Sequence, residues 1–535
     1  MIFSAVSRTW MSTLVRLGGQ SSAHHRHLPA DEQKISARAG MTSARFWTKD
    51  QSKLALLIYA AVFMNTLTFV LLVSDPLLTQ DSWYFLDVFV RHAYDGQLGL
   101  GDLFVQRSGF DHAEPLRKLI LLMELKWFRL SLLPQAVIGL FCAGGCAYLL
   151  HRLIRQEADK SSWGIEVPLM GLTIGCALIS LNSTGVWTWS LVALGYTSLI
   201  FVFWFFIAIW RACNSGRYLE VMIASALLAF VSDDTAILAG AAALLAVLGF
   251  GWKKSLRNGW WRVPALFIAI IAIEQILVGV FGPVTAADTV GEGGAKGGIL
   301  LHTFFQEGWW KWPVYALSNS AISKDMLNWL APTHVLRCQV VLAGILGCLH
   351  LWFWWGFLRR KAAGTAFVAV CLMLLYYAFV AGIIYGRVSD YGSDYLNQPR
   401  YVLLYQLNLV ALALMYVGGR PQQRTDWSRP AWARLRPGIV FTLAFLVLQP
   451  VFAKHAWHTA PYIRLYYWNM AEQTLALAKH PEITPKGCVP ELPICDMAPA
   501  KRAELLALLQ QHNLNLFNDK FRLMHGFQPD VQSDP

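Results

Sequence analysis

The sequence predicts an all-α polytopic membrane protein with about eleven transmembrane helices, because apolar runs of roughly 17–25 residues recur along it. The chain of 535 residues is 56% hydrophobic and only 15% charged. This is more apolar surface than a soluble core can bury. Segments of about ten residues with alternating hydropathy, typical of outer-membrane barrels, do not occur in the sequence. A soluble domain and a membrane barrel are therefore both disfavoured.

Residues 1–50 are polar, basic and without periodicity, and we expect a disordered cytoplasmic segment there. They lack the short apolar core and cleavage site of a signal peptide, and Met41 is an alternative start. A transmembrane domain is expected over 51–453. Its spans are placed near 53–73, 135–152, 163–182, 190–210, 219–232, 235–252, 263–282, 335–358, 363–385, 401–418 and 438–453.

Lys and Arg gather in every second connection between these spans. The basic connections are HRLIRQEADK, RACNSGR, KKSLRNGWWR, RRK and GRPQQRTDWSRPAWARLRPG. Cytoplasmic connections carry such an excess, so the N-terminus is predicted to be cytoplasmic. Connections 74–134, 283–334 and 386–400, and the C-terminal segment 454–535, then lie on the outer side of the membrane. The net charge of +12 fits this asymmetry and anionic lipid rather than nucleic-acid binding.

The connections on the outer side contain three further features. Residues 119–132 are apolar but include three charged side chains, so we expect an interfacial helix. The 283–334 connection begins Gly-rich and continues with many aromatic residues, which form either an ordinary aromatic belt or a groove for a lipid substrate. Cys488 and Cys495 lie close together in the C-terminal segment, where a disulfide is plausible. The other seven cysteines lie in or beside apolar spans and are expected to be buried thiols.

Carboxylates are concentrated in the segment that follows the first span. Asp75 comes directly after this span, near the level of the outer headgroups, and Asp81 stands two residues before Trp83. A carboxylate beside an aromatic surface is partly desolvated, which raises its pKa toward neutrality and suits a general base. The Trp83 ring could also stack on a sugar. Alternatively, Asp81 only caps the helix that follows it.

A second polar cluster precedes the predicted interfacial helix. It contains Arg107, Asp111, His112 and Lys118. Basic side chains at a helix N-terminus could bind a phosphate. Surface capping and contact with lipid headgroups are the alternative.

Two more groups of charged residues lie next to later spans. Arg387 and Arg400 belong to the connection before the tenth span, which Tyr401 opens. An Arg side chain binds a phosphate through two hydrogen bonds at once, although snorkelling to headgroups would also place it there. The pair Asp233–Asp234 separates two apolar helices, either as a tight turn or as a contact for substrate or cation.

With these motifs in this order, the chain resembles the GT-C superfamily of membrane glycosyltransferases, and more closely a group of bacterial polytopic proteins with that architecture. The likeness covers roughly residues 55–520. The matching residues are Asp81-Ser82-Trp83, Asp111-His112 with Lys118, STGVWTW at 183–189, Arg387, Arg400-Tyr401, and the closing LLALLQQHNLNLF. Ala113 stands where the group has an arginine.

The resemblance implies inverting transfer of a sugar from a polyprenyl-phosphate-linked donor to a glycan or lipid acceptor of the cell envelope, on the periplasmic side. The general base would be Asp81, with Asp75 and Asp111 as alternates. His112 is expected to position the acceptor. The basic side chains expected at the phosphate are Arg107, Lys118, Arg387 and Arg400. Two aromatic residues, Trp83 and Tyr401, complete the expected substrate-binding set. No P-loop, GxGxxG, HExxH or paired CxxC motif occurs in the sequence, so no cofactor or metal is predicted.

Two other classes of function compete with this hypothesis. A transporter or flippase of lipid-linked saccharides would need charged or broken helices near the membrane midplane, for which Glu274 and the Asp233–Asp234 pair are the candidates. A non-catalytic subunit of an envelope-assembly complex would use the segment 454–535 as its binding module.

Overall fold

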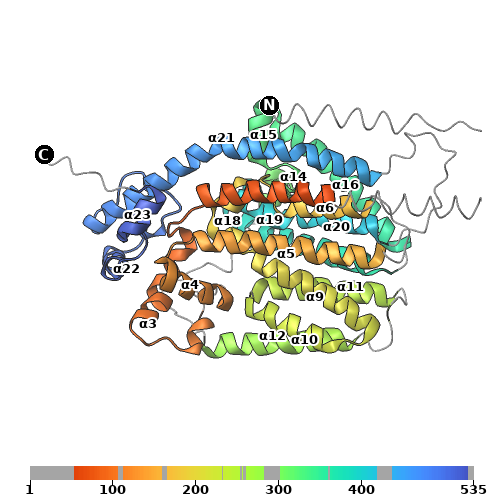
Figure 1. The fold of residues 1–535 in the computed structure, drawn as a ribbon, viewed down its shortest axis with the longest axis horizontal. Helices are drawn as coiled ribbons and strands as arrows, with labels where there is room; N and C mark the ends of the chain where they lie inside the picture. The colour runs from red at the N-terminus through yellow and green to blue at the C-terminus, as the bar shows by residue number, and fades with distance from the viewer. Residues whose placement is uncertain are drawn as a thin grey trace, which may run out of the picture.

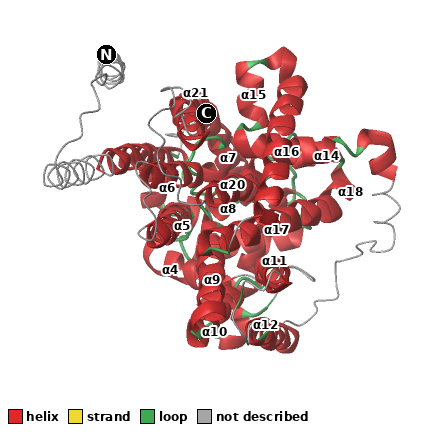
Figure 2. Cartoon of the chain, turned by 90° about the vertical axis from the view of Figure 1, so that its right-hand side faces the viewer, coloured by secondary structure: helices red, strands yellow, loops and turns green. Residues whose placement is uncertain are grey.

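A computed structural model describes residues 53–105, 113–158, 166–231, 233–252, 256, 261–281, 302–359, 362–418 and 437–527. Throughout these ranges the regular structure is helical, without a strand (Figure 2). Nine helices in these ranges are long and apolar enough to cross a membrane: Lys53–Val73, Leu133–Glu157, Ser190–Ser215, Thr235–Trp252, Arg262–Val280, Pro332–Arg359, Gly364–Tyr391, Pro399–Val417 and Ile439–Lys479. The prediction of an all-helical polytopic membrane protein is therefore confirmed. Shorter apolar helices, Pro168–Leu178 and Tyr218–Val231, lie where two more spans were predicted.

The helices follow the first span in three stretches of the chain. The first contains η1 (Gln80–Trp83), η2 (Leu86–Val90), α3 (Arg91–Tyr94), η3 (Leu100–Leu103), α4 (Pro115–Phe128), α5 (Leu133–Ala158), α6 (Glu166–Leu178), α7 (Thr184–Thr188), α8 (Ser190–Leu194), α9 (Tyr196–Ser215), α10 (Tyr218–Val231), α11 (Asp233–Trp252) and α12 (Arg262–Phe281). The second contains η4 (Phe304–Gly308), α14 (Lys311–Ala321), α15 (Lys324–Leu330), η5 (Pro332–His334), α16 (Val335–Arg359), α17 (Gly364–Ile383), η6 (Ile384–Val388), α18 (Ser389–Tyr391), η7 (Ser393–Asn397), η8 (Pro399–Tyr401), α19 (Val402–Tyr405) and α20 (Leu407–Val417). The third contains α21 (Pro437–Lys479), η10 (Pro493–Cys495), α22 (Pro499–Gln511), η11 (Asn515–Phe517) and α23 (Asp519–His525).

The centre of the bundle is formed by α17 and α20. Every residue of α20 is buried, and most of α17 is buried too. Both helices are apolar on all sides, which is the pattern of a helix surrounded by other helices rather than one that faces water or lipid. The first span, α5, α12 and α21 lie around this centre (Figure 1).

A second hydrophobic core lies at one end of the bundle, and we call the part of the molecule around it the outer cap. It consists of the described residues of 74–132 and 480–527, with α3, α4, α22 and α23 (Figure 1). Main-chain and side-chain hydrogen bonds join its two halves: Gln80 N donates to Glu491 O (2.8 Å), and Asn515 Nδ2 donates to Pro76 O (3.0 Å) and Leu130 O (2.7 Å). The segments after the first and last spans therefore share one end of the bundle.

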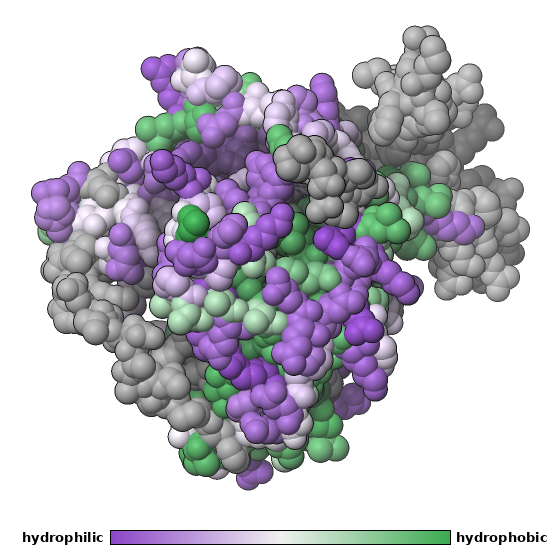
Figure 3. Space-filling view, turned by 90° about the vertical axis from the view of Figure 1, so that its left-hand side faces the viewer, coloured by the Kyte–Doolittle hydropathy of each residue, from purple (hydrophilic) through white to green (hydrophobic). Residues whose placement is uncertain are grey.

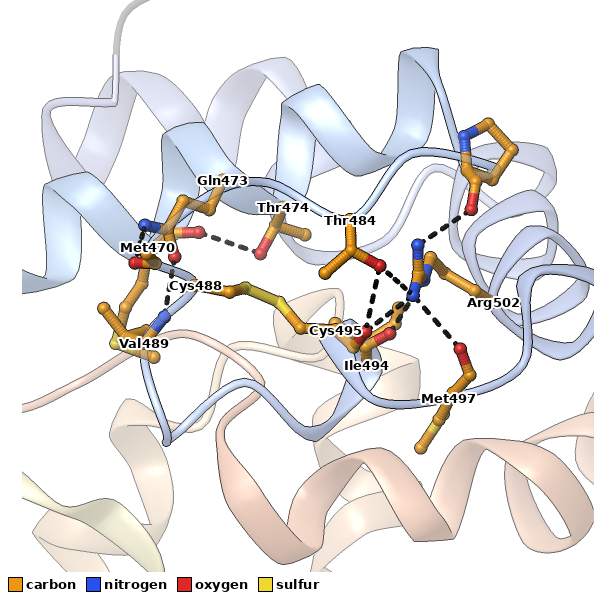
Figure 4. The surroundings of a disulfide bond; sticks show 12 residues. Met470, Gln473, Thr474, Thr484, Cys488, Val489, Ile494, Cys495, Met497 and Arg502 are labelled. Atoms are coloured by element: carbon orange, nitrogen blue, oxygen red, sulfur yellow. Dashed lines mark hydrogen bonds between the residues drawn. A yellow bond between two sulfur atoms is a disulfide. The ribbon is translucent and has the colours of Figure 1, made fainter.

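The C-terminal half of the outer cap is held by a disulfide and a buried arginine (Figure 4). Cys488 and Cys495 form the disulfide, as the sequence suggested. Arg502 is 2% exposed and donates to four backbone carbonyls and to the Thr484 hydroxyl. The preceding helix, α21, runs without interruption through residue 453, where we predicted the boundary between the transmembrane domain and the C-terminal segment.

Candidate functional site

The junction between α7 and α8 connects the outer cap to the bundle. Trp189 is extended (φ −96°, ψ 104°) and separates the two short helices. Because the last carbonyls of a helix have no partner within it, Thr188 O is free to accept hydrogen bonds from other segments. It accepts one from Asp75 N (2.8 Å) and one from the Tyr467 hydroxyl (3.0 Å), and Ser190 Oγ donates to Asp75 O (2.6 Å).

Asp75 is more buried than Asp81, the other candidate carboxylate that the structure describes, with 2% of its surface exposed. Its Oδ1 accepts a hydrogen bond from Leu77 N (2.8 Å), and its carboxyl group also bonds the Thr79 side chain. Burial raises the pKa of Asp75 from 3.8 to about 8, while these hydrogen bonds act in the opposite direction. The side chain forms an Asx turn, and its pKa is in the range that a general base needs near neutral pH.

Arg400 lies on the other side of the same junction, enclosed by aromatic rings. Its guanidinium carbon is 5.3 Å from the centroid of Trp189, 5.4 Å from that of Tyr395 and 5.2 Å from that of Tyr401. One of its amino groups donates to the Tyr395 hydroxyl. We call these four residues the Arg400 cage. The Ser183 hydroxyl donates to Pro399 O (2.9 Å), which fastens η8 to the start of α7.

Two buried hydrogen-bond donors of the Arg400 cage have no acceptor. They are Arg400 Nε and Trp189 Nε1. Arg400 is half-buried, and no carboxylate in the described part of the chain forms an ion pair with it, so its charge is left for another partner. Arg387, which is exposed, adds a second positive charge close to Tyr401. Such a group of donors and charges fits an anionic ligand, and the planar guanidinium suits a phosphate in particular.

The Arg400 cage and Asp75 are linked through consecutive residues of one segment. Asp75 is hydrogen-bonded to Thr188, and Arg400 lies against Trp189. Neighbouring Cα atoms are about 3.8 Å apart. A carboxylate that can accept a proton and a site for an anion are thus held by the same short junction.

Other residues that the sequence singled out have structural partners. Asp81 is half-buried in η1. Trp83 is 1% exposed and its indole donates to Leu78 O (2.9 Å), so its ring packs within the outer cap and is not a surface for a sugar. Lys118 is 2% exposed and donates to the carbonyls of Asp102 (2.9 Å), Leu103 (3.1 Å) and Val105.

The burial of Lys118 lowers its pKa from 10.5 to about 8, although Glu114 and Asp102 favour the charged form. Its donors are used in binding the carbonyls of the segment from Asp102 to Val105. Arg107, Asp111 and His112 lie outside the described residues. Of the predicted anion-binding residues, the structure therefore brings Arg387, Arg400 and Tyr401 together and places Lys118 elsewhere.

Sequence reasoning missed three members of this site. Trp189, Tyr395 and Ser190 were not among the candidate site residues, although two signals were available: a polar interruption, TWS, within an apolar run, and two tyrosines, Tyr391 and Tyr395, in the connection before Arg400. Glu124 in α4 was noted only as one of the charged residues of the predicted interfacial helix, and its burial was not predicted. It is fully buried, accepts a hydrogen bond from Gln135 Nε2 (2.8 Å), and has its pKa raised by burial to about 8.

No known protein family, curated protein or solved structure matches this chain. Within the described residues, no group of three or more His, Cys, Asp or Glu side chains is arranged to hold a metal ion. The functional assignment therefore depends on the geometry of Asp75 and of the Arg400 cage.

Proposed function

We propose that this protein is a GT-C-type membrane glycosyltransferase of the bacterial inner membrane. It moves a sugar from a polyprenyl-phosphate-linked donor to a glycan or lipid acceptor of the cell envelope, on the periplasmic face. The chain crosses the membrane eleven times, with its N-terminus in the cytoplasm and the outer cap in the periplasm. The observation that carries the proposal is the Arg400 cage, with its charge unpaired by any described carboxylate and its two unsatisfied donors.

In this proposal the phosphate of the donor binds in the Arg400 cage. Arg400 Nε and Trp189 Nε1 donate to its oxygens, and the exposed Arg387 adds positive charge. The acceptor hydroxyl oxygen attacks the anomeric carbon and passes its proton to a carboxylate. The bond between the anomeric carbon and the phosphate oxygen breaks, and polyprenyl phosphate leaves with the electron pair. Developing negative charge on the phosphate is stabilised by donors that are already in place.

Asp75 is the preferred general base, in place of Asp81. Asp75 is bonded to the segment that carries Trp189, and its pKa of about 8 leaves roughly a tenth of it ionised at pH 7. Activity should therefore rise as the pH increases toward 8. Asp81 and Asp111 stay alternatives, which substitution distinguishes.

Binding of polyprenyl phosphate to the purified protein in nanodiscs tests the site. Arg400→Gln should weaken binding by about 10- to 100-fold, because a hydrogen bond to a charged group is worth roughly 1.5–3 kcal/mol. The affinity of Arg400→Lys should lie between those of Arg400→Gln and the wild type, since Lys keeps the positive charge but loses the planar guanidinium that donates two hydrogen bonds at once. Arg359 is the matched control: it also lies over an aromatic ring, that of Trp355 (3.8 Å), but in the last turn of α16, away from the residues of the cage. Equal binding by Arg400→Gln, Arg359→Gln and the wild type would reject the site.

Sugar transfer in membranes tests the chemistry. Asp75→Asn should abolish transfer without lowering the amount of protein in the membrane. If Asp81→Asn alone abolishes it, the base is Asp81. If transfer persists in Asp75→Asn, Asp81→Asn and Asp111→Asn, singly and combined, the enzyme hypothesis fails.

A transporter or flippase of lipid-linked saccharides is the second candidate. Glu274 favours it, because this side chain is 5% exposed within the α12 span, where ionisable residues are costly and often functional. Gln275 Nε2 donates to it (2.8 Å). Loss of lipid translocation in Glu274→Gln, with Asp75→Asn unaffected, would favour this alternative.

A further inference from the structure

An apolar cavity of about 200 Å³ lies between α9, α11 and α12. Every residue that lines it is apolar, including Ile237, Ala241 and Leu244 of α11 and Phe267 and Ile268 of α12. These helices belong to the candidate membrane spans. The cavity is therefore surrounded by the part of the protein that contacts hydrocarbon.

Small residues of α11 create this space. A Cβ atom on Gly240 would lie 1.8 Å from the Phe267 ring, so the ring rests directly on the α11 backbone. Ala241 and Ala243 beside it are too short to fill the remaining volume. An apolar space of this kind holds no stable water. Left empty, it would also deprive its lining of dispersion contacts.

The cavity opens toward the lipid-facing surface of the bundle. Ile237 and Ile268 line it and are 43% and 58% exposed. A hydrocarbon chain can enter between them from the surrounding membrane. The ligand that fits the lining and the access route is therefore an alkyl or acyl chain.

A positive charge stands at one end of the cavity. Arg262 opens α12 and directly precedes Val263 and Pro264, which line the cavity. Arg262 is exposed, lies 5.6 Å over the Trp261 ring, and forms no ion pair with a described residue. A Trp and an Arg side by side at a helix end are typical of the headgroup level, where anionic lipids gather.

We propose that this cavity binds one acyl chain of an anionic phospholipid, with the lipid phosphate at Arg262. The site is separate from the Arg400 cage, because α12 begins at the end of the bundle opposite to the outer cap. Arg262 favours a phospholipid of the leaflet opposite to the outer cap, because the phosphate of that lipid lies at the level of the arginine. The chain of the sugar donor is disfavoured, because its phosphate would lie on the side of the outer cap. This inference does not depend on the glycosyltransferase proposal.

Native mass spectrometry of the detergent-purified protein tests the site with three probes: phosphatidylglycerol, phosphatidylcholine and polyprenyl phosphate. The wild type should retain one phosphatidylglycerol in preference to phosphatidylcholine. Ala241→Trp plugs the mouth and should reduce retention at least fivefold, and Ile268→Trp, which plugs it from α12, should do the same. Ile273→Trp is the matched control, since Ile273 is 58% exposed on α12 but does not line the cavity.

Arg262→Gln should remove the preference for phosphatidylglycerol while some phospholipid still binds. Unchanged phosphatidylglycerol retention in both mouth variants would overturn the inference. Loss of polyprenyl phosphate, but not of phosphatidylglycerol, in those variants would assign the cavity to the donor chain and overturn it as well. Failure of Arg400→Gln to alter polyprenyl-phosphate binding bears only on the proposed function.

Discussion

The buried carboxyl group of Asp75 should make the stability of this protein depend on pH. Its pKa is 3.8 when exposed to water and about 8 in the folded protein, mainly because of burial. Between these values the folded protein binds more protons than the unfolded chain. Stability is therefore full at low pH and is lost as the pH rises toward the folded pKa.

The size of this effect follows from the two pKa values. For a single group that titrates at 3.8 unfolded and about 8 folded, the free energy of unfolding falls by about 2 kcal/mol between pH 6 and pH 8. The decrease levels off above pH 8. Asparagine cannot titrate, so Asp75→Asn should remove this contribution and flatten the pH profile by the same amount. Glu124, whose pKa is also about 8, adds a similar slope that Glu124→Gln should remove.

The assay is reversible urea unfolding in mixed micelles at pH 6, 7 and 8, followed by tryptophan fluorescence. The wild type, Asp75→Asn, Glu124→Gln and the double variant are compared. Each single substitution should remove about half of the slope and the double variant most of it. If Asp75→Asn keeps the wild-type slope while Glu124→Gln loses it, Asp75 is not protonated near neutral pH and the reasoning about its burial is refuted.

Three further predictions concern the outer cap. Trp83→Ala should lower the free energy of unfolding by roughly 3–5 kcal/mol and Trp83→Phe by clearly less, because Trp83 fills the core of the outer cap. Equal urea midpoints for the Ala and Phe variants would place Trp83 outside that core. Cys488→Ser with Cys495→Ser should cost about 2 kcal/mol, as expected for a short closed loop, and an unchanged midpoint under oxidising conditions would argue against the bond. Arg502→Leu should leave five acceptor groups without their donor and expose the segment after α21 to limited proteolysis. Lys486→Leu, a change at an exposed residue of the same segment, should not increase proteolysis. Identical digestion of both variants would contradict the role given to Arg502.

The helical membrane bundle could be predicted because hydropathy is a local property of the chain. Nine of the predicted spans coincide with the long apolar helices, and the other two, 163–182 and 219–232, coincide with the shorter helices α6 and α10. The outer cap could not be predicted in this way. Its core joins residues near Trp83 to residues near Leu505, about 400 positions later, and no local pattern marks such a pairing. Trp83 therefore looked like a surface aromatic residue, although it packs inside the cap.

The candidate site was predictable only in part, for a related reason. Arg387, Arg400 and Tyr401 stood out because charged residues beside an apolar span are conspicuous. Lys118 stood out equally, but in the folded chain its donors are taken by three carbonyls. Whether a basic side chain is available for a ligand depends on its partners in space, which the order of residues does not reveal.

The most direct test of the proposed function is a structure of the protein in nanodiscs with bound polyprenyl phosphate. We expect the phosphate within hydrogen-bonding distance of Arg400 Nε and Trp189 Nε1, with the chain leaving the site along the bundle and Asp75 on the side of the incoming acceptor. A polyprenyl phosphate whose phosphate lies beside Glu274, or beside Arg262, while the Arg400 cage stays empty, would contradict the proposal.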